Sequence, residues 1–170
     1  FKLRPVAGGV EFSELNLNLK GLQVGGSAGW SGRAGVTSSW YKGRMQGADL
    51  GTVLQAWNFA PSVTSERFRV DADVRWPGSP AWVSLARLSG TLNGSMHNGS
   101  LPEVQGGGTN ALRVFGLLNF SAIGRRLRLD FSDLFGKGMA YDRVGVLLAG
   151  DNGVFVTREP LDIKGPSAKL

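Results

Sequence analysis

The chain has 170 residues, 26 of them glycine, with no cysteine and a formal net charge of +6. Without cysteine it can form neither disulfides nor thiolate metal sites. The basic residues alternate along predicted strands and do not form a block, which is typical of a solvated strand face rather than a nucleic-acid footprint. No apolar run reaches the ~20 residues that a membrane-spanning helix needs.

The first part of the chain is predicted to be extended. Residues 10–19 alternate leucines with polar residues, which indicates a strand. Gly25-Gly26 and Ser31-Gly32 are interpreted as turns, and residues 34–46 alternate again. The chain begins at Phe1 without methionine and ends after a strand-like segment, so we expect a slice of a longer protein.

Residues 49–59 are predicted to form a short helix. Their apolar side chains recur at spacings that place them on one helical stripe, and Asp49 precedes them as a candidate N-cap. Pro61 ends the segment.

The segment from Glu66 to Trp76, written ERFRVDADVRW, has the clearest pattern in the sequence. After Glu66 it alternates strictly between charged and apolar residues, which predicts a strand with one apolar face and one ionic face. The apolar face consists of Phe68, Val70, Ala72, Val74 and Trp76, and the ionic face of Arg67, Arg69, Asp71, Asp73 and Arg75.

Residues 81–96 are predicted to continue as a second strand with one apolar face. Asn93-Gly94 and Asn98-Gly99 are turn-type pairs, and the second pair fits a tight hairpin with residues 101–104 as its return. The apolar side chains expected on one face of this run are Trp82, Ala86, Leu88, Leu92 and Met96.

The last part of the chain repeats this order of helix and strands. A glycine loop at residues 106–108 precedes a helical segment at about 109–127, and strands follow at 139–149, 154–157 and 161–163. We therefore divide the chain into residues 1–105, strands with one helix, and residues 106–170, a helical segment followed by antiparallel strands. The order suggests a degenerate repeat.

No residue pattern points to catalysis or to metal binding. His97 is the sole histidine and is expected in an exposed turn, and Asp130 and Asp133 are explained as caps and turn acceptors. We expect no enzyme activity, no cofactor and no metal site. The five tryptophans either fill a core or line a groove or a membrane interface.

Four segments resemble a known family. They are WPGSPAWVSLARLSGTLNGSMHNGSLPEV, ALRVFGLLNF, RRLRLDFSDLFGKGMAYDRV and GVFVTREPLDIKGPSA. These segments are similar to the AsmA-like C-terminal region of the YhdP proteins, which belong to the AsmA/TamB family of Gram-negative bacteria. The resemblance is close from about Val74 onward and general before it.

This resemblance implies a periplasmic protein that is anchored to the inner membrane by a helix outside this chain. It implies a curled antiparallel sheet whose apolar groove carries phospholipid between the inner and outer membranes, without catalytic residues or cofactors. The expected fold is thus mostly β with short helices, a slice of an elongated repeating β-groove. Expected partners are phospholipids, both membranes and other envelope proteins, but not nucleic acid.

The apolar strand faces supply the candidate groove-lining residues, because a carrier must keep apolar surface beside the acyl chain along its whole path. We expect the charged alternates to face the periplasm. The candidate lining residues are Phe68, Val70, Ala72, Val74, Trp76, Trp82, Leu88 and Leu92.

Other functions stay open. A non-conducting scaffold module of the same envelope protein would have its groove blocked by side chains such as Phe115 and Leu118. A carbohydrate-binding β-domain would expose its tryptophans on a flat or concave polar face. A hydrolase would need Asp130 and Asp133 together in one cleft.

Overall fold

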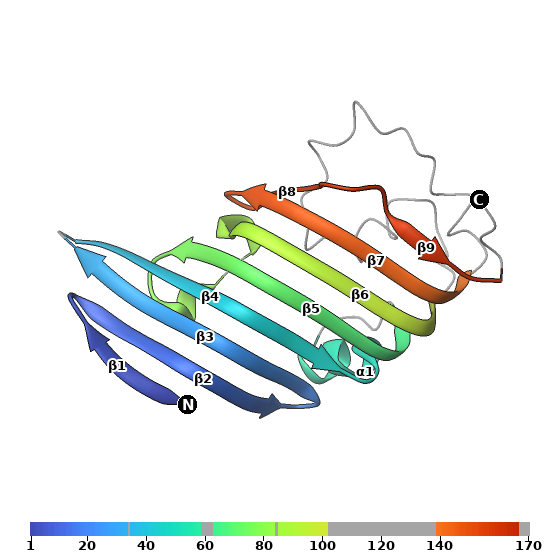
Figure 1. Ribbon diagram of the computed structural model, residues 1–170, viewed down its shortest axis with the longest axis horizontal. Helices are drawn as coiled ribbons and strands as arrows, with labels where there is room; N and C mark the ends of the chain where they lie inside the picture. The colour runs from blue at the N-terminus through green and yellow to red at the C-terminus, as the bar shows by residue number, and fades with distance from the viewer. Residues whose placement is uncertain (34, 59–62, 84, 102–138, 167–170) are drawn as a thin grey trace.

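The computed structural model describes residues 1–33, 35–58, 63–83, 85–101 and 139–166. These residues form an open antiparallel sheet in which the order of the strands follows the order of the chain from β1 to β8, while β9 pairs with β7 (Figure 1). A single α-helix and two 3₁₀ turns complete this part of the chain. The expected fold class is confirmed: a mostly β, antiparallel sheet that does not close on itself.

Strands β2 to β7 are long, with 11 to 14 residues each, whereas β1, β8 and β9 are short. The strands are β1 (Lys2–Val6), β2 (Gly9–Leu19), β3 (Leu22–Arg33), β4 (Val36–Gly47), β5 (Thr64–Pro77), β6 (Ser89–Leu101), β7 (Met139–Asp151), β8 (Val154–Thr157) and β9 (Asp162–Lys164). The helix α1 (Leu50–Ala56) connects β4 to β5, and the 3₁₀ turns η1 (Pro80–Trp82) and η2 (Leu85–Arg87) lie between β5 and β6. The helix expected at about 109–127 and the boundary expected at residue 105 lie outside the described residues.

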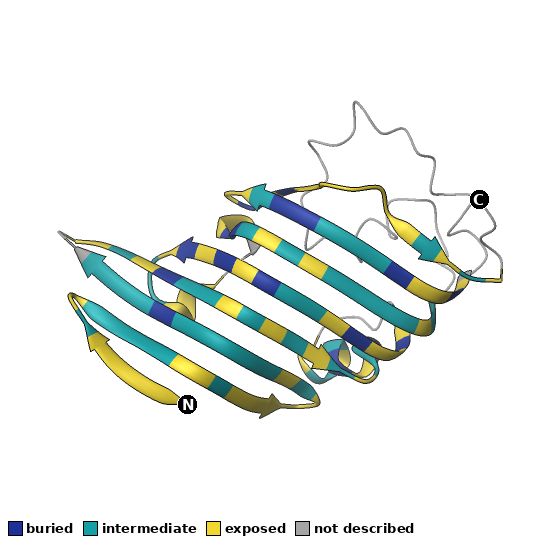
Figure 2. Cartoon of the chain, viewed as in Figure 1, coloured by how far each residue is buried: buried dark blue, intermediate teal, exposed yellow. Residues whose placement is uncertain are grey.

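Strand β5 has the two faces that its sequence predicts. Buried and exposed residues alternate along it (Figure 2), with Phe68, Ala72, Val74 and Trp76 buried and Arg67, Arg69, Asp73 and Arg75 exposed. Because residues paired across two strands lie on the same face, this division extends to the neighbouring strands. The middle strands of the sheet, β4 to β6, therefore have one apolar face and one polar face.

Strand β2 keeps its apolar residues on one face by means of a bulge. The pairing with β3 shifts between Phe12 and Leu15, and Glu14 there has a positive φ of 53°. The extra residue brings even-numbered Phe12 and odd-numbered Leu15 to the same side of the sheet. Neither this bulge nor strand β1 is foreseen in the sequence pattern.

The prediction of turns at Gly25-Gly26 and Ser31-Gly32 is wrong, because β3 runs unbroken through both pairs. The glycines allow close pairing instead. Gly26 has φ +133°, and a Cβ there would overlap the backbone of Lys42 and Gly43 in β4.

The predicted hairpin at Asn98-Gly99 is also wrong, as is the turn at Asn93-Gly94. Strand β6 continues to Leu101 and pairs with β5 on one side and β7 on the other, in the same register before and after Asn98. Asn98 has φ +47° and donates a hydrogen bond to Glu66 at 2.8 Å. Asparagine tolerates this conformation. Asn98-Gly99 therefore makes a local kink in β6, which pairing with β5 and β7 keeps extended.

The predicted strand over residues 81–96 begins later than expected, at Ser89. Residues before it form η1 and η2, and Trp82 in η1 is 62% exposed. Pro77 ends β5 and Pro80 begins η1. Proline has no backbone N–H group to donate to a neighbouring strand, so the extended ladder stops here. Trp82 therefore does not share the sheet face of Leu88 and Leu92.

Helix α1 is fixed to the sheet through the carboxylate of Asp49. Its Oδ1 accepts hydrogen bonds from the backbone N–H groups of Gly51 and Ser65, both at 3.0 Å, and its Oδ2 accepts one from Thr52 Oγ1 at 2.8 Å. Burial opposes ionisation, but these hydrogen bonds outweigh it and lower the pKa of Asp49. Asp49 thus caps the helix and ties it to the start of β5.

Two buried clusters lie on the apolar face. The first, the β8-side cluster, contains Ala72, Val74, Trp76, Leu88, Leu148 and Phe155. The second, the helix-side cluster, contains Val63, Tyr141 and Val144, with Leu50 and Leu54 of α1 packed against it. Tyr141 is 2% exposed and its hydroxyl donates a 2.6 Å hydrogen bond to the carbonyl of Thr64.

The stability of the protein should fall steeply in alkali because of Tyr141. Burial, with a smaller effect of the Asp49 carboxylate, raises the pKa of Tyr141 to about 12. The unfolded phenol ionises near pH 10, so the unfolded state loses its proton first and stability is lost as pH rises from about 10 to 12. Urea unfolding of the parent and of Tyr141→Phe at several pH values measures this effect.

The Tyr141→Phe protein should be less stable than the parent at neutral pH, by about 1–3 kcal/mol, because the Thr64 carbonyl loses its donor. Its stability should then decline less between about pH 10 and pH 12. Tyr41 titrates in both proteins, so its effect cancels in the difference. Parallel declines in the two proteins would contradict this role of Tyr141.

Candidate functional site on the apolar face

A row of small and apolar residues crosses the sheet between the two buried clusters. Strand pairing places Leu17 opposite Val24, Val24 opposite Met45, and Met45 opposite Val70. The row continues through Gly94 to Val146. We call these six residues the apolar strip: Leu17, Val24, Met45, Val70, Gly94 and Val146.

The apolar strip is the accessible part of this face. Leu17 is 37% exposed, and the other five residues are half-buried, whereas the clusters on either side contain fully buried side chains. The strip crosses from β2 to β7, so at about 4.8 Å between neighbouring strands it is about 24 Å long. A bilayer core is ~30 Å thick, so the acyl chain of one leaflet extends about 15 Å. The strip is long enough for one extended acyl chain.

The structure divides the candidate lining residues of the sequence into three groups. Val70 lies in the apolar strip, and Leu92 is half-buried beside it. Phe68, at 4% exposure, and Trp76, at 8%, are buried. Ala72, Val74 and Leu88 are buried as well, and Trp82 lies off the face.

Sequence reasoning missed five members of the strip: Leu17, Val24, Met45, Gly94 and Val146. Their alternation is visible in the sequence, most clearly at Leu15, Leu17 and Leu19. What is not visible is the strand register, which decides that these residues align with Val70.

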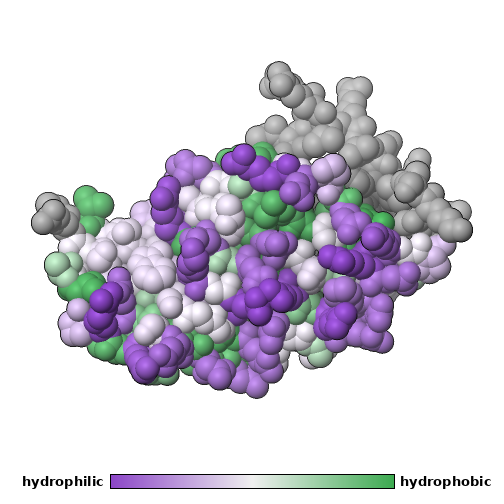
Figure 3. Space-filling model, viewed as in Figure 1, coloured by the Kyte–Doolittle hydropathy of each residue, from purple (hydrophilic) through white to green (hydrophobic). Residues whose placement is uncertain are grey.

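The opposite face is ionic. Lys42 forms an ion pair with Asp73, with an N···O distance of 2.8 Å. Asp71 forms ion pairs with both Arg44 and Arg69, each also with an N···O distance of 2.8 Å. The hydrogen bond from Arg69, reinforced by Arg44, lowers the pKa of Asp71. Figure 3 shows this face, with hydrophilic side chains over the middle strands. These charged residues face solvent, as the sequence predicts.

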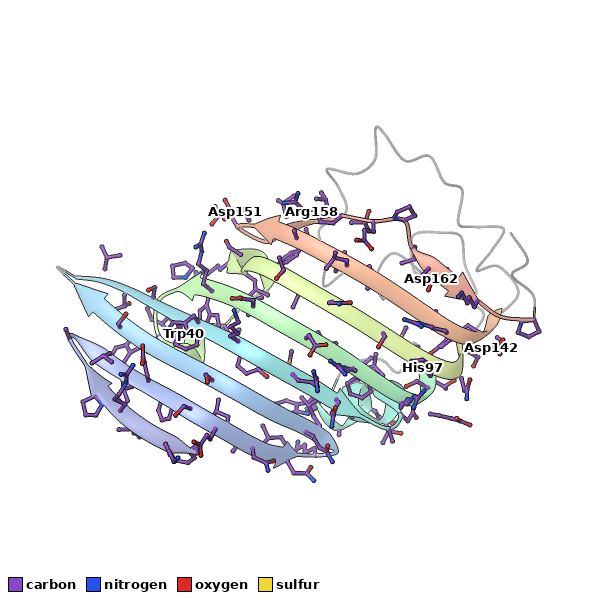
Figure 4. The ribbon with its side chains drawn as sticks, in the orientation of Figure 1. Trp40, His97, Asp142, Asp151, Arg158 and Asp162 are labelled. Carbon is purple, nitrogen blue, oxygen red and sulfur yellow. The ribbon has the colours of Figure 1, made fainter. Side chains whose placement is uncertain are left out.

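An open trough of ≈ 680 Å³ lies on this polar face, over β2 to β6. Its lining includes amide, hydroxyl and charged side chains and no tryptophan. Trp40 is on the same face, but its indole ring covers Gly29 of β3, where a Cβ would collide with Trp40 Nε1 (Figure 4). The trough on the polar face thus lacks the exposed tryptophans that a carbohydrate-binding platform would need.

His97 is half-buried within strand β6, so the prediction that it lies in an exposed turn is wrong. It is on the polar face, between Arg67 of β5 and Arg143 of β7 (Figure 4). Burial and these two arginines lower its pKa, so it is neutral at pH 7. In the described part of the chain no three histidine or acidic side chains gather as metal ligands. Asp130 and Asp133 lie outside the described residues.

A family model described as YhdP protein matches residues 1–170. The chain belongs to the YhdP family. The match includes the residues before Val74, where the sequence segments alone show only a general likeness. A YhdP-family relative, the intermembrane phospholipid transporter YhdP of Escherichia coli (strain K12), is 26% identical over 132 residues.

That alignment covers 78% of this chain and 10% of the relative, so the chain spans about a tenth of the length of that YhdP protein. No solved structure matches the chain. Among the described residues, no helix combines the length and the apolar composition needed to cross a bilayer.

Proposed function

We propose that this chain is a segment of an envelope lipid carrier and that the acyl chains of phospholipid lie along the apolar strip. The apolar strip supports the proposal, because it offers accessible apolar surface across β2 to β7 in one continuous row. Membership of the YhdP family, whose E. coli relative is named for phospholipid transport between membranes, supports the choice of ligand.

A lipid carrier needs an apolar surface that continues without interruption along the path of the acyl chain. Each CH₂ group that moves from an apolar surface into water costs about 0.8 kcal/mol. A carrier that interrupts its apolar surface therefore creates a barrier that grows with the length of acyl chain left in water. A row with one apolar or small residue from each strand avoids such an interruption.

The proposal places the chain in the periplasm between the inner and outer membranes, as part of a protein anchored to the inner membrane by a segment outside these residues. Phospholipids and both membranes are the partners that follow from it, together with other envelope proteins. Phe68, Ala72, Val74, Trp76, Leu88 and Leu92 then shape the walls beside the strip, while Val70 contacts lipid directly.

The second candidate is a scaffold segment that conducts no lipid. The burial of Phe68, Ala72, Val74 and Trp76 favours it, because residues closed off in a core offer no surface to an acyl chain. In this case the half-buried strip would be the outer edge of an ordinary core.

In-cell photo-crosslinking separates the two functions. A photoreactive residue at Leu17 or Val70 should capture phospholipid, whereas one at Asn18 or Asp71, the neighbours on the polar face, should not. Phospholipid is assayed on the crosslinked protein band. Equal or absent labelling on the two faces would reject lipid carriage by this segment and leave the scaffold function.

A further inference from the structure

Near the strip residue Leu17, the sheet presents an exposed cation next to exposed apolar side chains. Leu19 lies two residues further along β2 on the same face and is 40% exposed. The β2–β3 turn follows, and α1 is at this end of the sheet (Figure 1). A Cβ on Gly21 in that turn would contact Val53 of α1, so the turn and the helix are packed together.

Lys20 connects the turn to the end of the helix. Its Nζ donates a 2.9 Å hydrogen bond to the carbonyl of Ala56 and lies 5.6 Å from the centroid of the Trp57 ring. Trp57 caps α1 and is 45% exposed. The ammonium is therefore held in one place by a helix C-terminus and an aromatic face, both of which attract a cation.

This ammonium differs from most other cations of the sheet. Lys2, Arg4, Lys42, Arg44, Arg69 and Arg143 each pair with a carboxylate. In the part of the chain that the structure describes, Lys20 has no carboxylate partner. An ammonium group has three donors, and the bond to Ala56 uses one of them.

We propose that Lys20, with Leu19 and Trp57, binds the phosphate of a phospholipid headgroup whose acyl chain lies on the apolar strip. We call these three residues the rim site. The ammonium supplies the charge for the phosphate, and the exposed indole supplies the amphipathic surface that is favoured between headgroup and hydrocarbon. Leu19 continues the apolar surface from Leu17 to this point, which favours a lipid phosphate over a free anion.

The rim site rests on the proposed function, since a headgroup is held there only if lipid occupies the strip. The test uses the photoreactive residue at Leu17 in the protein as it is made in the cell. Lys20→Gln should reduce the phospholipid recovered at Leu17 about fivefold, because one basic residue at a lipid surface contributes about that factor in binding. Lys20→Arg should restore the recovery.

Asn18→Asp is the matched control, because it removes one unit of positive net charge at a nearby position on the opposite face. It should leave the recovery unchanged. The thermal midpoints of the variants show whether Lys20 acts only by holding α1 to the turn. A lower midpoint without loss of lipid would reject the rim site.

The outcomes separate the two proposals. Lipid at Leu17 that is unaffected by Lys20→Gln, or reduced equally by Asn18→Asp, overturns the rim site and leaves the carrier function. Absence of lipid from both Leu17 and Val70 in the parent protein overturns the carrier function and the rim site together. An excess of phosphatidylglycerol over phosphatidylethanolamine in the parent, lost in Lys20→Gln, would support charge-based selection at the rim.

Discussion

Substitution of Gly99 by alanine is expected to lower the free energy of unfolding by about 3 kcal/mol, the upper end of the usual cost of overpacking. A Cβ on Gly99 would overlap the carbonyl oxygen of Thr64 and would lie 2.6 Å from the hydroxyl of Tyr141. These are the two partners of the hydrogen bond that joins β7 to β5. The backbone of β5 and the buried ring of Tyr141 cannot both move away, so the alanine breaks this bond.

Gly94 provides the matched control in the same strand. A Cβ there would meet only Cγ1 of Val146, at 3.3 Å, and that contact is with a single methyl group. Gly94→Ala should therefore cost less than about 1 kcal/mol. Urea midpoints of the two variants measure the difference. Similar losses in both would mean that glycine is needed along β6 for backbone reasons and not for the Thr64–Tyr141 contact.

Substitution of Val70 by arginine is expected to reduce the phospholipid recovered from a photoreactive residue at Met45 about tenfold. Arginine at the centre of a bilayer costs ~2.5–3.5 kcal/mol, and a half-exposed side chain that reaches toward water retains about 1.4 kcal/mol of that cost, which is a tenfold effect. Val70 lies opposite both Met45 and Gly94, in the middle of the apolar strip.

Asn93→Arg is the control for added charge, since Asn93 precedes Gly94 but lies on the polar face, opposite Asp71. It should leave the lipid at Met45 unchanged, and Val70→Leu should do the same. Circular dichroism and thermal midpoints confirm that the variants fold. A folded Val70→Arg protein with undiminished lipid would show that lipid does not cross the sheet at this row.

The two-faced character of the sheet could be predicted from sequence because it depends on local alternation. The segment from Phe68 to Trp76 shows it without any knowledge of its neighbours, and the structure confirms both faces. The apolar strip could not be predicted, because it depends on which residue of each strand aligns with Val70. Register is set by the pairing of whole strands and by features such as the bulge at Glu14.

The wrong turn predictions have a common physical cause. Glycine and asparagine mark positions where the backbone can take a positive φ, and both Gly26 and Asn98 do so. A turn forms at such a position only where the backbone N–H and C=O groups would not gain more hydrogen bonds by pairing with neighbouring strands. Strands β3 and β6 each have two neighbours over most of their length, and the ladder bonds on both sides keep these residues within the strand.

The agreement between strand order and chain order has a consequence for how the molecule is made. Each strand from β2 to β8 pairs with the strand that precedes it in the chain. When the chain is synthesised from its N-terminus, the partner of each new strand has therefore already been made. The sheet can grow one hairpin at a time, as repeat proteins propagate, and each addition closes only a short loop wherever the connection is short. The contact of Tyr141 with Thr64 spans 77 residues and forms only after this growth, so it fastens a sheet that is already assembled.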